Sequence, residues 1–107
     1  MPLVKRSKAN DQDLIEIWLF IAEDDPSAAD QMLDFIEVQL QGLASSPTMG
    51  RVRYDLWPDA MCFPIFKNSW RMRYMVFYRS IPGGIEVARI IEGHRDIPNI
   101  LTGDEGA

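Results

Sequence analysis

The chain has 107 residues, of which 47% are hydrophobic and 25% charged, and its formal net charge is −5. This length fits one domain around a single core, and there is no run of about 18 apolar residues to form a membrane-spanning helix. The acidic balance argues against a protein that coats nucleic acid, and the charged N-terminus argues against a secretory signal.

The first half of the chain predicts a short strand and two helices. Residues 3–6 can form the strand, and apolar residues recur at helical spacing over residues 8–23 and again over residues 26–44. Because the break between the helices is short, we expect them to form an antiparallel hairpin.

The expected helix ends carry capping signals. Asp25 is placed to cap the second helix, and Pro26 fits its first position. Ser7 and Asn10 are both possible caps of the first helix.

The second half of the chain alternates between polar and apolar residues, as is typical of strands. Turn residues divide it into four predicted strands at 51–56, 61–66, 70–80 and 85–92. Pro64 restricts the second of these strands to a sheet edge or a bulge.

Helices followed by strands, without βαβ alternation, indicate an α+β fold. We expect an N-terminal short strand and an antiparallel two-helix hairpin packed on one face of a C-terminal antiparallel β-sheet. Residues 1–98 would form this single domain, and residues 99–107 a flexible C-terminal tail.

Charge is distributed unequally along the chain. Residues 1–50 contain three basic and nine acidic residues, whereas residues 51–96 contain eight basic and five acidic residues. Seven of these eight basic residues are arginines, which suit two-point contacts to carboxylates or phosphates. They could equally be a solvated face of the sheet or partners for the acidic helices.

Few residues suggest catalysis. Cys62 is the sole cysteine and lies in an apolar run, so we expect a buried structural thiol in a reducing cytoplasm. His94 is the sole conventional acid–base candidate, although it fits a hydrogen-bonding role at a strand end as well. Metal-ligand spacing, a phosphate-binding loop and a nucleophile motif are all missing from the sequence.

The first predicted helix is apolar around most of its girth near its C-terminal end, where Ile17, Trp18, Leu19 and Phe20 follow one another. A sheet can cover only one side of a hairpin. The surplus apolar surface indicates either a protein interface or a hairpin that is buried on several sides, and the sequence leaves both open.

The succession of motifs resembles the RelE/ParE superfamily of toxins from bacterial toxin–antitoxin pairs, and most of all its ParE branch. The matching motifs lie in the helical hairpin, the helix exit, the strands and the closing segment: residues 14–22, 25–30, 43–47, 50–53, 63–64, 74–79, 84–91 and 93–97.

This resemblance implies a cytoplasmic toxin without cofactor, metal or enzymatic activity, which poisons DNA gyrase, arrests growth and is neutralised by a ParD-like antitoxin in a hetero-oligomer. It implies neither membrane binding nor sequence-specific DNA binding by this chain alone. The alternative is a RelE-like ribosome-dependent mRNA endoribonuclease that uses His94, Arg79 and Arg89. That branch often uses a tyrosine near the C-terminus, and here no tyrosine follows Tyr78.

On the gyrase hypothesis, the target-binding residues would be basic side chains of the sheet half: Arg51, Arg53, Arg79, Arg89 and Arg95. The antitoxin would bind apolar side chains of the hairpin and the flanking sheet: Ile17, Trp18, Phe20, Ile21, Phe35 and Phe77.

Overall fold

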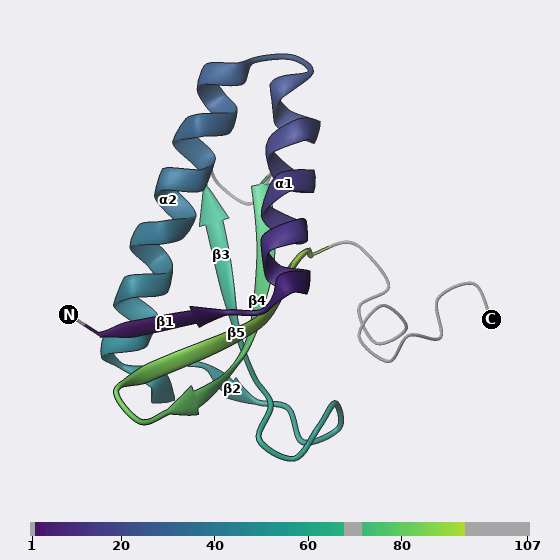
Figure 1. Ribbon diagram of the computed structural model, residues 1–107. Helices are drawn as coiled ribbons and strands as arrows, with labels where there is room; N and C mark the ends of the chain where they lie inside the picture. The colour runs from purple at the N-terminus through teal and green to yellow at the C-terminus, as the bar shows by residue number, and fades with distance from the viewer. Residues whose placement is uncertain (1, 68–71, 94–107) are drawn as a thin grey trace.

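A computed structural model describes residues 2–67 and 72–93, so His94, Arg95 and the predicted tail lie outside the described residues. Two helices lie side by side on a five-stranded sheet (Figure 1). The elements in chain order are β1 (Leu3–Arg6), α1 (Lys8–Ala22), α2 (Pro26–Ser45), the 3₁₀ turn η1 (Pro47–Met49), β2 (Arg51–Val52), β3 (Met61–Lys67), β4 (Met72–Ile81) and β5 (Gly84–Glu92).

The sheet has the order β1-β5-β4-β3-β2, and its last four strands are antiparallel as predicted. The α+β prediction is confirmed, and the short N-terminal strand β1, whose partner the sequence did not predict, joins the sheet parallel to β5. The pairing runs from Leu3 opposite Gly84 to Arg6 opposite Val87. Strand β1 ends at Arg6, and after Ser7 the chain begins helix α1, which packs along β5.

The helix caps follow the sequence signals. Ser7 rather than Asn10 caps α1, since its hydroxyl accepts a hydrogen bond from the Asn10 backbone N–H at 2.9 Å. The Asp25 carboxylate accepts from the N–H groups of Ser27 and Ala28, and Pro26 begins α2 as predicted.

The strand predicted for residues 51–56 is wrong beyond Val52. From Arg53 to Ala60 the chain forms a loop, which the Arg53 N–H closes by donating to the Ala60 carbonyl at 2.8 Å. In Figure 1 this loop projects at the end of the molecule opposite to the connection between α1 and α2. Because β2 is short, it pairs only with Met61 and Cys62, and beyond them β3 is an edge strand in the part of the chain that the structure describes. Pro64 lies on this open stretch, which confirms its expected edge position.

Two apolar clusters lie on opposite faces of the sheet. The main core lies between helices and sheet, and its fully buried members include Met32, Ile36, Leu40, Ile65, Val76, Tyr78, Ile85 and Val87. The smaller cluster on the other face contains Cys62, Phe77 and Ile91, and the loop after β2 covers it with Leu56 and Trp57. Cys62 is therefore buried, as predicted.

Tyr78 ties the exit of α2 to the sheet. Its hydroxyl donates to the Pro47 carbonyl at 2.5 Å and accepts from the Gly50 N–H at 3.0 Å. A Cβ atom at Gly50 would lie 2.1 Å from this hydroxyl oxygen, so the close approach requires glycine. Burial raises the pKa of Tyr78 above its usual value.

Candidate functional site

The arginines of β2, β4 and β5 share the sheet face that lies away from the helices, whereas Arg6 of β1 pairs with Glu37 of α2. Residues opposite one another on neighbouring strands point to the same face. Arg51 lies opposite Cys62, and both Cys62 and Arg89 lie opposite Phe77 of the smaller cluster. Arg73 and Arg79 follow the same alternation along β4. We call this surface the arginine face.

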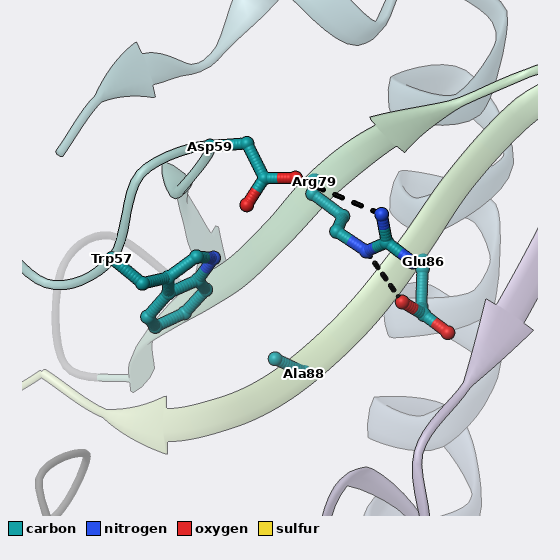
Figure 2. Close-up of a pocket in the computed structure, with 5 residues that line it drawn as sticks. All are labelled: Trp57, Asp59, Arg79, Glu86 and Ala88. Carbon is teal, nitrogen blue, oxygen red and sulfur yellow. Dashed lines mark hydrogen bonds and ion pairs between the residues drawn. The ribbon is translucent and has the colours of Figure 1, made fainter. Parts of the chain in front are cut away.

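Arg79 is held between two carboxylates. Its Nε lies 2.6 Å from Glu86 Oε1, and its Nη1 lies 3.6 Å from Asp59 Oδ2. Figure 2 shows the guanidinium between these acids, with Trp57 and Ala88 nearby. These five residues line a pocket of about 330 Å³. The hydrogen bond to Glu86 raises the pKa of Arg79 further, so this side chain is a compensated cation.

Arg53 is compensated as well. Its Nε and Nη2 each lie 2.9 Å from a carboxylate oxygen of Asp55, two residues further along the loop. This hydrogen bonding raises the pKa of Arg53 and lowers the pKa of Asp55. The pair fixes the start of the loop that covers the smaller cluster.

Arg89 forms a two-point ion pair with Asp13 of α1, with both N–O distances at 2.8 Å. Asp13 is buried, and its Oδ2 also accepts from the Ile90 backbone N–H at 2.9 Å. We did not predict a role for Asp13 from the sequence. Its spacing of four and eight residues from Ile17 and Ile21 would have placed it on the buried stripe of the helix.

Arg51 and Arg73 differ from these three arginines. Both side chains are exposed, and among residues 2–67 and 72–93 neither forms an ion pair with a carboxylate. The Arg73 guanidinium lies over the Phe66 ring, 5.9 Å from its centre. The structure therefore separates the arginine face into compensated and uncompensated cations.

A second surface is a groove of about 650 Å³ between α1 and the ends of β4 and β5, which we call the α1 groove. Three residues that the sequence suggested for partner binding, Ile17, Phe20 and Ile21, line one wall of it. The remaining lining residues are Asp13, Glu16, Arg73, Tyr74, Ile90, Ile91 and Glu92. Phe20 is 76% exposed, so among the described residues nothing covers most of this apolar side chain.

The other suggested antitoxin contacts lie elsewhere. Trp18 is half-buried, and its indole N–H donates to Asp30 at 2.8 Å, so it joins the two helices. Phe35 is half-buried beneath Lys67, whose Nζ lies 5.6 Å from the ring centre. Phe77 is fully buried in the smaller cluster because the loop after β2 covers it. The structure therefore contradicts the expectation that Phe77 contacts a partner.

The structure describes two of the three residues that the sequence suggested for a ribonuclease. Arg79 and Arg89, two of the three residues suggested for a ribonuclease, are bound to carboxylates, and His94 lies outside the described residues. Within residues 2–67 and 72–93, no three histidine, cysteine or acidic side chains are grouped so that they could hold a metal ion. The described helices include none that is both long and apolar enough to cross a membrane.

Comparison with known proteins gives a family match over most of the chain. The model of a family described as "ParE toxin of type II toxin-antitoxin system, parDE" matches residues 4–97. A solved structure described as "Chromosomal ParDE TA system from P. aeruginosa" has the same fold, with a TM-score of 0.65 at 19% identity over 86% of this chain and 96% of the other. No curated protein matches the chain in sequence.

Proposed function

Because this chain belongs to the ParE toxin family of type II toxin–antitoxin systems, we propose that it is a cytoplasmic toxin that inhibits DNA gyrase and arrests growth. A ParD-like antitoxin neutralises it by direct binding. The observation that carries this proposal is the family match over residues 4–97, which includes both the helical hairpin and the arginine face.

The toxin acts by binding rather than by catalysis. A side chain that stabilises a transition state must be free to meet the charge that develops there. Arg79 and Arg89 instead neutralise Glu86 and Asp13 within the fold. This arrangement supports a surface that recognises another protein over a ribonuclease site.

The antitoxin binds the α1 groove with an apolar segment. Phe20 supplies an exposed aromatic ring, and Ile17 and Ile21 form the buried wall behind it. Aromatic side chains that fill a partner's pocket dominate many protein interfaces. The antitoxin would cover Phe20 and remove this apolar surface from water.

The test is an assay of purified toxin against two targets. We expect inhibition of DNA supercoiling by gyrase, with gyrase-dependent DNA cleavage, and intact messenger RNA on programmed ribosomes. Addition of the ParD-like antitoxin should restore supercoiling. Cut message without any effect on gyrase would instead establish the ribonuclease.

A further inference from the structure

We propose that Arg51 and Arg73, the uncompensated cations of the arginine face, contact the toxin's target, and that they bind an acidic protein surface. The compensated residues Arg53, Arg79 and Arg89 keep structural roles. This inference rests on the proposed function, because it assigns the residues that recognise the target.

Charge compensation separates the two groups of arginines. Arg53, Arg79 and Arg89 each already have a carboxylate within 2.9 Å. A partner's carboxylate could bind them only by sharing or displacing that acid, so little interaction energy would be gained. Arg51 and Arg73 have no such carboxylate among the described residues. A carboxylate of the partner protein can therefore form a new ion pair with each of these exposed guanidinium groups.

Exposed apolar side chains accompany the two uncompensated arginines. Met49 and Tyr54, which are near Arg51 in the sequence, are 52% and 74% exposed. Phe66, which lies under the Arg73 guanidinium, is 47% exposed. Arginine, tyrosine, methionine and phenylalanine are enriched in protein interfaces, so this surface has their composition as well as a positive charge.

One partner can reach both arginines. Arg51 lies opposite Cys62 on one side of β3, and Arg73 lies opposite Phe66 on the other side. The two positions are four residues apart along β3, which corresponds to about 13 Å. An interface of ordinary size, about 800 Å² per partner, covers both side chains.

The charge pattern favours a protein partner over a nucleic acid. Contact with a phosphate backbone needs several uncompensated cations in succession. The arginine face instead mixes its cations with the acids Asp55, Asp59 and Glu86, and the whole chain has a net charge of −5. A duplex would meet these acids as well, whereas a protein surface can place one carboxylate at each arginine.

The test compares alanine variants of the full chain for affinity to purified gyrase and for growth arrest after induction without antitoxin. We expect Arg51→Ala and Arg73→Ala each to weaken gyrase binding about tenfold, and the double variant to abolish growth arrest. Lys8→Ala, which removes an exposed cation on α1, is the matched control and should leave both readouts unchanged. Because both arginines are exposed, the variants should melt like the wild type.

Several results would overturn the assignment. Wild-type affinity in the double variant would do so, as would a larger loss in Arg53→Ala than in Arg51→Ala. Equal losses of affinity for gyrase and for gyrase-free duplex DNA would show that the arginines bind nucleic acid. If the wild type arrests growth without inhibiting gyrase, the proposed target is wrong, and the growth readout alone decides whether Arg51 and Arg73 contact the true target.

Discussion

The buried carboxylate of Asp13 binds the guanidinium of Arg89 and the backbone N–H of Ile90 at the same time. Strand β1 ends opposite Val87, so within residues 2–67 and 72–93 β5 has no strand partner on that side from Ala88 onward. Helix α1 occupies the edge instead, and Asp13 supplies the hydrogen-bond acceptor that a neighbouring strand would have given to Ile90.

Replacing Asp13 should therefore destabilise the fold. Asp13→Ala leaves the partly buried Arg89 without its carboxylate and Ile90 without an acceptor, and we expect a loss of about 3 kcal/mol in the free energy of unfolding. Urea denaturation followed by circular dichroism measures this loss in the free energy of unfolding. The exposed pair partner Asp55 provides the control, because Asp55→Ala should leave the midpoint nearly unchanged. Equal midpoints for the two variants would show that the Asp13 contacts do not stabilise the fold.

Alanine substitutions at Gly50, which contacts Tyr78, and at Gly42, which has open space around it, should change stability in opposite directions. Gly50→Ala places a methyl group against the Tyr78 hydroxyl and should cost about 2 kcal/mol. Gly42→Ala, at an exposed helical position with no atom within 4 Å of the new Cβ, should stabilise by about 0.5 kcal/mol. In thermal melts, the melting temperature should fall for Gly50→Ala and rise for Gly42→Ala. A stable Gly50→Ala protein would mean that the exit of α2 can shift away from β4.

Phe20 should matter for antitoxin binding and little for folding. Since 76% of the side chain is exposed, Phe20→Ala removes few internal contacts and should keep the wild-type melting temperature. We expect the affinity for the antitoxin to fall at least tenfold, measured by calorimetry. Val38→Ala, an exposed apolar residue of α2 that does not line the α1 groove, serves as the control. Unchanged affinity in Phe20→Ala would place the antitoxin elsewhere.

Stability should fall at alkaline pH. Burial raises the pKa of Tyr78 and of Tyr74 in the folded protein, so above about pH 10 the unfolded chain loses these protons first. The stabilisation is complete below the unfolded pKa and is lost as the pH rises through the folded values. Urea titrations between pH 8 and 11 should show this decline, with a shallower slope in Tyr78→Phe because Tyr74 still titrates. An identical slope in that variant would rule out a contribution from Tyr78.

Local patterns predicted most of the fold. Helical spacing and the caps at Ser7 and Asp25 place the hairpin, and alternation places three of the four later strands. The alternation at residues 51–56 predicted a strand that is too long, because the turn residues that follow Val52 fold the chain into a loop. The partner of β1 depends on a pairing between the two ends of the domain, which no local pattern contains.

The site was less predictable than the fold. Alternation places arginines on one face of the sheet, but it does not show which of them meets a carboxylate. Arg89 finds its partner in Asp13, far away in the sequence, and the exclusion of Phe77 from the surface depends on how the loop after β2 packs. Only the folded structure distinguishes Arg51 and Arg73 from the arginines that stabilise the fold.

The parallel pairing of β1 with β5 has a consequence for how the chain is made. Leu3 cannot pair until Gly84 has been made, so β1 joins β5 only after most of the domain has been synthesised. Such distant contacts slow folding, because a long loop must close before they can form. A chain that is truncated before β5 therefore has an incomplete sheet, and this domain completes its sheet only after β5 has been synthesised.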